Sequence, residues 1–324
     1  MKTNCLFLFV LFSAASLFGN TAEKELIRLM ERVHTTTARV RAGNAPAAPV
    51  LDGVMSAGEW DNATVLSGFS TTGNKGQLLG AKPGKVFIQR TNDHLYIAVK
   101  TITRNDSPGG GLSNNATKKD SISIANDDCV ELTFQNPQKP DELKHLLFNP
   151  GGYCLDILRT ISTRNQDPAW DMKGLKIASK VETFYWVLEI AVPLKEIVGT
   201  GGKFRFNVAR NWCDTGSFST LNKVAKYFQP KEMIEVTLDQ KNVIVRQDEI
   251  GNFDDGNFDA AATLDNHYGK DVIFALMLHE YIFKKIDGKV KRFHKVHGLK
   301  HAIVKPGEHK KLIFSHNDDS KKML

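Results

Sequence analysis

Few residues of this chain have the types and spacing that catalysis or metal binding requires. His279 and Glu280 begin like the His-Glu-x-x-His motif of zinc proteases, but Phe283 stands where the second histidine would be. The sequence has no Gly-x-Ser-x-Gly motif and no phosphate-binding glycine loop. A glycosidase needs two carboxylates at a defined separation, which a sequence alone does not display. These observations favour a binding protein and leave a glycosidase as the catalytic alternative.

Three histidines in the C-terminal part, His294, His297 and His301, have spacings that would suit a metal on a helix. Gly298 makes a helix unfavourable there, and we interpret them as surface residues. They lie within 284–324, where twelve Lys or Arg face four Asp or Glu, an excess of +8 against +7 for the whole chain. This stretch could contact the cell envelope or an anionic polysaccharide, or it could be the solvated surface of a small domain.

The first 22 residues have the features of a secretory signal peptide. Lys2 precedes an apolar run from Cys5 to Phe12, and small residues continue to Gly19. The run is shorter than the roughly 20 residues that a membrane-spanning helix needs, and no later segment is apolar enough to span a bilayer. We therefore predict export to the periplasm or the extracellular space, which argues against a nucleic acid partner and against stable membrane insertion.

Alternation of apolar and polar residues predicts β-strands through the middle of the chain. In 129–135, for example, Val130, Leu132 and Phe134 share one face. Such strands, separated by Gly and Pro turns, predict an antiparallel sandwich whose sheets each turn one face to the core. The predicted strands are 85–90, 94–101, 129–135, 143–149, 153–158, 184–192 and 203–211.

The pattern divides the chain into five parts. The signal peptide (1–22) is followed by a short amphipathic helix and linker (23–49), and the sandwich covers 50–238. A polar spacer (239–269) then leads to a small, basic, His-rich, β-rich region (270–324). The predicted fold class is all-β: an antiparallel β-sandwich with a small C-terminal β-rich domain.

Seven short motifs follow one another in the order of a known module. They are Leu51-Asp52-Gly53, Gly58-Glu59-Trp60, Asp93 to Ala98, Asp127 to Leu132, Phe148 to Gly152, Trp186 to Pro193, and Phe206 to Arg210. Over roughly 50–238, this order resembles the family 9 carbohydrate-binding module and its wider group of carbohydrate-binding-like β-sandwich domains.

The resemblance implies a sugar held between two aromatic rings, with a glutamate and polar side chains beneath it. Rings stack on the apolar face of a pyranose, and carboxylate or amide groups bind its hydroxyls. Glu131 and Tyr227 match two of the family's binding positions. The second ring and two polar contacts are replaced by Ala125, Leu147 and Ala209. The ligand therefore differs, or other groups build the pocket, or this chain does not bind free sugars.

Two further tryptophans could stack on a sugar or could simply pack. Trp170 lies in a polar loop, and Trp212 follows a predicted strand. Trp60 and Trp186 belong to the motifs above, and we predict both in the core.

Several charged residues have structural interpretations. We predict Glu189 on an exposed strand face and Arg210 in a buried pair with Asp127 or Asp128. The resemblance also implies that a structural calcium ion is possible. No loop has a calcium-binding motif, but five residues could supply oxygen ligands: Asp52, Glu59, Asp61, Asp127 and Asp128.

Three cysteines follow the predicted signal peptide. Cys129 and Cys154 lie on strands predicted to be neighbours and could form a disulfide, whereas the alternative is that these two and Cys213 are free thiols.

The sequence as a whole favours a secreted carbohydrate-binding protein that recognises a poly- or oligosaccharide and takes part in carbohydrate catabolism. A glycosidase, or the accessory module of one, is the first alternative. The second is a haem-binding sandwich, for which His145 and Met172 are conceivable axial ligands because related sandwiches include haem-binding domains. A non-catalytic adhesion or scaffold protein is the third.

Overall fold

The computed structural model describes residues 3–13, 39–67, 69–71, 84–104, 108–199, 201–213, 216–221, 230–238, 243–250, 257–286 and 289–317. Within these ranges the chain consists of β-strands, the four-residue helix α2 (Leu194–Ile197) and three 3-10 turns: η1 (Pro108–Gly111), η2 (Ile122–Asn126) and η3 (Pro230–Glu232). The all-β prediction is confirmed. The helix predicted within 23–49 lies outside the described residues. None of the described helices has the length and apolar character needed to cross a membrane.

One sheet of the sandwich, the β8 sheet, has the strand order β11-β10-β9-β8-β14-β15-β5. These neighbours are antiparallel, while β16 pairs with both β14 and β2. Its strands are β2 (Arg39–Arg41), β5 (Ser70–Thr71), β8 (Cys129–Gln135), β9 (Glu142–Phe148), β10 (Cys154–Thr160), β11 (Asn165–Asp167), β14 (Lys203–Trp212), β15 (Ser217–Thr220) and β16 (Ile234–Thr237).

The opposing sheet, the β7 sheet, has the order β12-β13-β7-β6-β4-β17-β18-β21, with β3 beside β6. Its strands are β3 (Gly43–Asn44), β4 (Thr64–Ser67), β6 (Gly84–Arg90), β7 (His94–Ile102), β12 (Lys176–Val181), β13 (Tyr185–Pro193), β17 (Val243–Ile250), β18 (Asn257–Asn266) and β21 (His309–Asn317).

The two sheets enclose one apolar core. Val130, Leu132 and Phe134 of β8 pack in the same cluster as Trp186 of β13, as their alternation predicts. Trp60 is also buried, in a second cluster with Tyr96 and Ala98 of β7, so both tryptophans assigned to packing are confirmed there. Burial of each large apolar side chain contributes about 1.5–3 kcal/mol.

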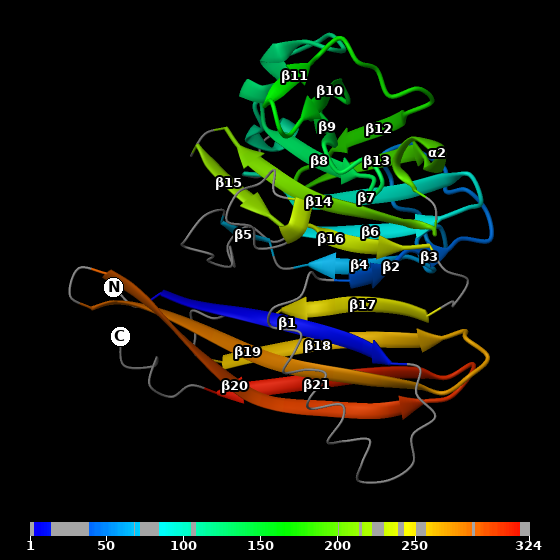
Figure 1. The fold of residues 1–324 in the computed structure, drawn as a ribbon, viewed down its shortest axis with the longest axis vertical. Helices are drawn as coiled ribbons and strands as arrows, with labels where there is room; N and C mark the ends of the chain where they lie inside the picture. The colour runs from blue at the N-terminus through cyan, green and yellow to red at the C-terminus, as the bar shows by residue number, and fades with distance from the viewer. Residues whose placement is uncertain are drawn as a thin grey trace.

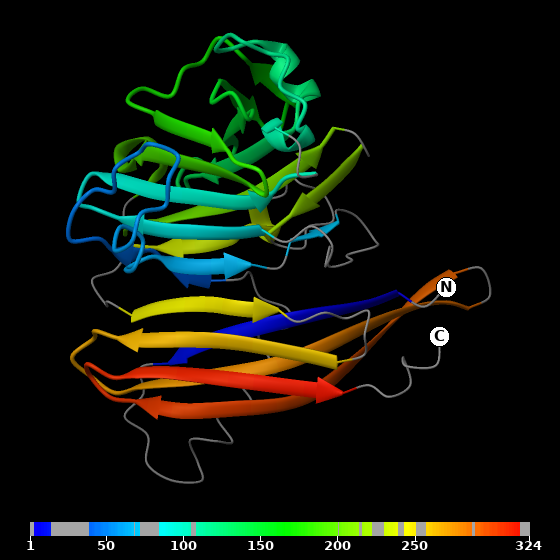
Figure 2. The same ribbon diagram turned by 180° about the vertical axis from the view of Figure 1, so that it is seen from behind.

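The C-terminal part forms a further layered unit below the sandwich (Figures 1 and 2). Strands β17, β18 and β21 continue the β7 sheet, and β17 runs parallel to β4 at Arg246 and Val65. Against them lies a three-stranded sheet of β1 (Thr3–Ser13), β19 (Val272–Ile286) and β20 (Lys289–Val304). Val245, Leu264, Phe274 and Leu312 belong to the core of this unit.

The prediction of a polar spacer at 239–269 is wrong, because these residues include the strands β17 and β18. Polar residues and three consecutive alanines, Ala260 to Ala262, hide the alternation of β18, yet all three alanines and Leu264 are buried. Within the region 270–324, predicted to be β-rich, β19 is one continuous strand with a register shift at Leu278 and His279.

Strand β1 coincides with the apolar run of the predicted signal peptide. It pairs antiparallel with β19, from Thr3 opposite Phe283 to Ser13 opposite Ile273. Removal of residues 1–22 remains a prediction, and it would leave this edge of β19 without its neighbour.

Glu189 is fully buried on β13, so its predicted place on an exposed strand face is wrong. Its carboxylate accepts hydrogen bonds from the backbone N–H groups of Asp52 (3.1 Å) and Gly53 (2.8 Å) and from Nε1 of Trp60 (3.1 Å). Burial raises the pKa of Glu189, and these three donors oppose that rise. Three of the motifs noted in the sequence are thus parts of one structural contact.

Cys129 and Cys154 are free and buried, and Cys213 is free and exposed. A disulfide between Cys129 and Cys154 is prevented by the topology, because β9 separates their strands. Cys154 also packs in the sandwich core, whereas Cys129 packs in a cluster on the opposite face of the same sheet.

Candidate functional site

The β8 sheet turns a mixed polar and apolar surface away from the sandwich core, which we call the Glu131 face. At its centre Glu131 lies directly opposite Leu147 of β9 on one side and Ala209 of β14 on the other. Side chains of directly opposite residues project to the same face of a sheet. The strand register therefore brings together three positions that the resemblance assigned to one binding site.

Glu131 is held by a histidine on the same face. Nε2 of His145 lies 2.7 Å from Oε2 of Glu131, and Nε of Arg159 donates to Nδ1 of His145 at 3.1 Å. Because Nδ1 accepts, the ring is neutral with its proton on Nε2, which donates to the carboxylate. Burial lowers the pKa of His145, and the adjacent Glu131 only partly offsets this effect. The arrangement fixes the orientation of the carboxylate.

Next to this pair lies a buried hydroxyl. Thr133 stands opposite His145 on one side and Asn207 on the other. The side chain of Thr133 is fully buried, and its Oγ1 has no hydrogen-bond partner among the described residues. An unsatisfied buried hydroxyl costs about 1–3 kcal/mol, so a ligand group or water that reached it would recover stability.

Apolar side chains form the other part of the face. Leu147, Leu155 and Ile157 pack with Cys129 and Ile124, and Ala125 of η2 lies against them. One strand beyond Ala209, the half-buried ring of Phe218 on β15 packs against that alanine. Phe218 is an aromatic residue at the site that sequence reasoning missed, because its strand β15 is short and was not predicted.

Of the other predicted binding residues, the two that the structure describes do not meet Glu131. Tyr227 lies outside the described residues. Trp170 is half-buried against the sandwich core, with Nζ of Lys144 5.3 Å from its ring centroid. Trp212 has the same strand alternation as Val208 and Arg210, which places it on the core side of β14, and it is 1% exposed. Trp212 therefore has no surface on which a sugar could stack.

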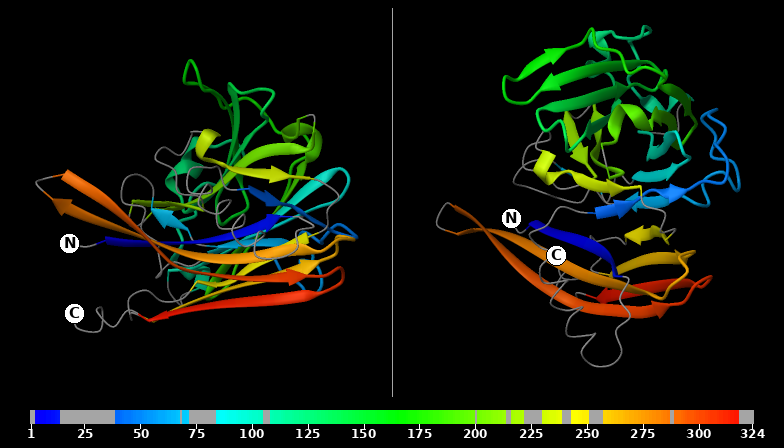
Figure 3. Two further views of the ribbon diagram at one scale, coloured as in Figure 1. Left: turned by 60° about the horizontal axis from the view of Figure 1, so that its bottom comes forward. Right: turned by 45° about the vertical axis from the view of Figure 1, so that its right-hand side comes forward.

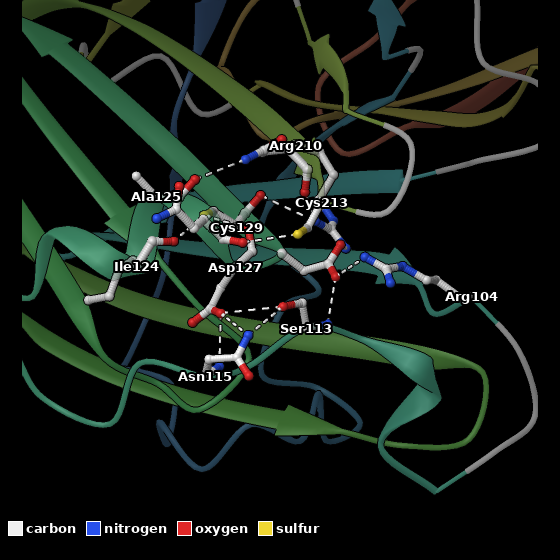
Figure 4. Close-up of polar contacts among 12 residues, drawn as sticks. Arg104, Ser113, Asn115, Ile124, Ala125, Asp127, Cys129, Arg210 and Cys213 are labelled. Atoms are coloured by element: carbon white, nitrogen blue, oxygen red, sulfur yellow. Dashed lines mark hydrogen bonds and ion pairs between the residues drawn. The ribbon is translucent and has the colours of Figure 1, made fainter.

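Arg210 is confirmed in a buried ion pair, with Nη2 3.0 Å from Oδ1 of Asp128 (Figure 4). Its guanidinium lies between the rings of Trp186 and Trp212, at 5.0 and 4.1 Å from their centroids. Burial lowers the pKa of Arg210 to about 10, and Asp128 opposes this shift. Arg104 pairs with the second oxygen of Asp128.

The neighbouring Asp127 is satisfied by N–H groups rather than free for a cation. It accepts from the backbone of Asn115 (2.8 Å) and Ala116 (2.9 Å) and from Nδ2 of Asn149 (3.0 Å). Burial raises its pKa, but these donors outweigh burial and hold the pKa below its usual value. Among the described residues no group of three or more His, Cys, Asp or Glu is arranged to hold a metal.

The haem hypothesis does not fit the geometry. Both ring nitrogens of His145 are engaged, by Glu131 and Arg159. Met172 is buried in the sandwich core, on the other side of the β8 sheet from His145. The two side chains cannot ligate one iron.

Solved structures show where this architecture has been seen before. A protein of Bacteroides uniformis described as a candidate carbohydrate-binding protein matches 63% of this chain and all of its own, with 14% identity and a TM-score of 0.50. Family 9 carbohydrate-binding modules of Caldicellulosiruptor kristjanssonii in complex with cellotriose and with glucose match 62% and 66% of this chain, at 15% and 16% identity. They are covered over 93% and 100% of their lengths, with TM-scores of 0.44 for both. The sandwich is like the Bacteroides uniformis protein in fold. At this identity the likeness shows the fold alone. No protein-family model matches the sequence, and the comparison with curated proteins found no match.

Proposed function

We propose that this chain is a secreted carbohydrate-binding protein that recognises a poly- or oligosaccharide on the Glu131 face and serves carbohydrate catabolism. The observation that carries the proposal is the convergence of Glu131, His145, Thr133 and Phe218 on one side of the β8 sheet. The fold shared with the Bacteroides uniformis protein, described as a candidate carbohydrate-binding protein, supports it. The signal peptide predicted at residues 1–22 supports secretion.

The chemistry of the face suits a sugar. The carboxylate of Glu131, oriented by His145, accepts a hydrogen bond from a sugar hydroxyl. The ring of Phe218 supplies an apolar surface for the C–H face of a pyranose. This arrangement differs from a clamp of two aromatic rings. With alanines at positions 125 and 209, only one described aromatic side chain lies beside the site.

Binding is favoured over glycosidase activity by the carboxyl groups of the face. Hydrolysis uses two carboxyl groups roughly 5–10 Å apart. In the described parts of β8, β9, β10 and β14, Glu131 is the only acidic residue that shares the side of His145 and Leu147. It is also paired with His145, which suits a fixed acceptor better than a proton donor.

The test is binding to a panel of soluble oligosaccharides and insoluble polysaccharides, followed by calorimetry and pull-down, with reducing-sugar release measured in parallel. Glu131→Gln should weaken binding at least ten-fold, whereas Glu182→Gln, an exposed site in the turn between β12 and β13, should change it less than two-fold. Equal affinity of the Glu131→Gln variant would place the site elsewhere. Absence of binding to every glycan would overturn the proposal, and release of reducing sugar that Glu131→Gln abolishes would establish the glycosidase alternative.

A further inference from the structure

The β7 sheet has an outer face, turned away from the sandwich core, of which one part is covered by the chain itself. Met55 and Trp60, from the segment between β3 and β4, cluster there with Tyr96 and Ala98 of β7. This segment, in blue, lies beside one end of β6 and β7 (Figures 2 and 3). The rest of the outer face, toward the other end of these two strands, is more open to solvent.

A row of lysines crosses this open part of the face. Lys85 of β6 lies directly opposite Lys100 of β7. Lys100 in turn lies opposite Val187 of β13, which is opposite Lys180 of β12. Val99 packs in the sandwich core, so its neighbour Lys100 and the residues opposite it project outward. Because adjacent strands are about 4.8 Å apart, the three lysines are attached within roughly 15 Å.

Two of these lysines have no carboxylate partner among the described residues. Lys180 pairs with Glu182 at 3.1 Å. Nζ of Lys85, by contrast, donates to the backbone carbonyl of Asp248 at 2.9 Å, and Nζ of Lys100 lies 4.2 Å from the centroid of an aromatic ring. Like charges directly opposite each other destabilise a strand pair. An anion bound between Lys85 and Lys100 would remove this repulsion.

The ring beside Lys100 belongs to Tyr185, which lies at the start of β13 and is 44% exposed. An exposed aromatic ring can stack on the apolar face of a pyranose. In a uronic acid the carboxylate is attached directly to the pyranose ring. A uronic acid stacked on Tyr185 would therefore bring its carboxylate within reach of the ammonium group of Lys100.

We propose that Lys85, Lys100 and Tyr185 form a second binding site, for an acidic polysaccharide built from uronic acids. The unpaired positive charge favours an anionic partner, and the exposed ring in contact with a cation favours a sugar over the phosphates of a nucleic acid or a lipid. The choice of polysaccharide rests on the proposed function. The site lies on the opposite sheet from the Glu131 face, so each site can be removed without the other.

The experiment compares polygalacturonate with its highly methyl-esterified form, which has the same backbone with most of its charge removed. The purified protein should bind polygalacturonate at least ten-fold more tightly than the ester, with an affinity that falls as salt is raised. Lys85→Gln/Lys100→Gln should lose at least ten-fold in affinity and show a shallower salt dependence. Lys118→Gln/Lys195→Gln, the same charge change at two exposed lysines elsewhere, should stay within two-fold.

Conservative variants separate binding from folding. Lys85→Arg/Lys100→Arg keeps both charges and should bind polygalacturonate normally. Tyr185→Phe keeps the ring and should also bind normally, whereas Tyr185→Ala should lose at least five-fold in affinity. Unchanged affinity in Tyr185→Ala would show that no sugar ring stacks there and would contradict the proposal.

The remaining outcomes are equally decisive. Equal binding to the ester, or equal loss in the two Gln double variants, would overturn the proposal. Tighter binding to duplex DNA or to vesicles rich in phosphatidylglycerol would overturn it in favour of another polyanion. Glu131→Gln should leave polygalacturonate binding unchanged. Binding of neutral glycans that depends on Glu131, with no binding of polygalacturonate, would overturn this second site and leave the proposed function standing.

Discussion

His145 and Glu131 form a hydrogen-bonded pair across adjacent strands, with Nε2 2.7 Å from Oε2, on a face where Arg159 donates to the remaining ring nitrogen. Arg159, which lies two strands away from Glu131, therefore sets the tautomer of His145. A protonated ring would present an N–H to the Arg159 donor and lose that hydrogen bond. The pair thus ties the orientation of Glu131 to the neutral state of His145.

Because the orientation of Glu131 depends on a neutral His145, we expect the fold to be less stable in acid. The pKa of His145 is below 6.5 in the folded protein, because burial disfavours the charged ring, and near 6.5 in the unfolded chain. Between these two values the unfolded chain binds the extra proton, so the free energy of unfolding should fall as pH drops below about 6.5. Urea denaturation at pH 7.5 and 5.5 measures the change. His145→Gln, which cannot titrate, should show a smaller loss, and an identical pH profile in both proteins would contradict the assignment.

Asp156 predicts the opposite dependence on pH. It is fully buried, and burial raises its pKa to about 6 from 3.8, with Asp120 adding to the rise. The folded protein holds a proton that the unfolded chain releases, so this stability is present below pH 3.8 and is lost as pH rises to about 6. Asp156→Asn should be more stable than the parent at pH 7, by up to about 3 kcal/mol. The difference should shrink at pH 4, and a constant difference would argue against the raised pKa.

The charge of Asp128 should be indispensable to the sandwich. Asp128→Asn leaves Arg210 buried between two tryptophan rings with no full negative charge beside it. Removing one member of a buried ion pair costs about 3–5 kcal/mol. Chemical denaturation should show a loss of this size, whereas Asp61→Asn, at an exposed position, should change stability by less than about 0.5 kcal/mol. A loss of stability below about 1 kcal/mol would show that the packing of Arg104 and of the two tryptophan rings does not depend on the charge of Asp128.

The thiols should differ sharply in reactivity. Cys213 is exposed, while burial raises the pKa of both Cys129 and Cys154. A thiol reagent added to the folded protein should label Cys213 within minutes, and the other two only after urea is added. Peptide mapping assigns the labels, and Cys213→Ser should remove the fast phase. Fast labelling of Cys129 in the native state would contradict the packing of that face.

The strands of the sandwich could be predicted because each has one apolar face and ends at Gly, Pro or Asn. The predicted 129–135 coincides with β8, and 203–211 differs from β14 by one residue. Prediction failed where burial does not follow side-chain polarity. Glu189 is charged yet buried, because backbone N–H groups more than 130 residues away satisfy it. In β18, small alanines carry the core and give no periodic signal.

The candidate site likewise contains residues that the sequence could connect and residues that it could not. Glu131, Leu147 and Ala209 could be linked by their order in the sequence, and the register places them side by side. His145 and Phe218 were not connected with Glu131, because their proximity depends on which strands are neighbours. For Trp212 the sequence left stacking and packing open, because the end of a strand can face inward as readily as outward, and the structure shows packing.

The contact of Glu189 with Asp52, Gly53 and Trp60 also imposes an order on biosynthesis. The three donors are made 129 to 137 residues before their acceptor. At roughly 5–20 residues per second, a ribosome needs on the order of ten seconds to add that length. Until β13 is complete, these groups have only water as a partner. The loop that contains Asp52 and Trp60 is therefore made early and stabilised late: β4 can pair with β6 as soon as both are made, but the hydrogen bonds to Glu189 wait for β13.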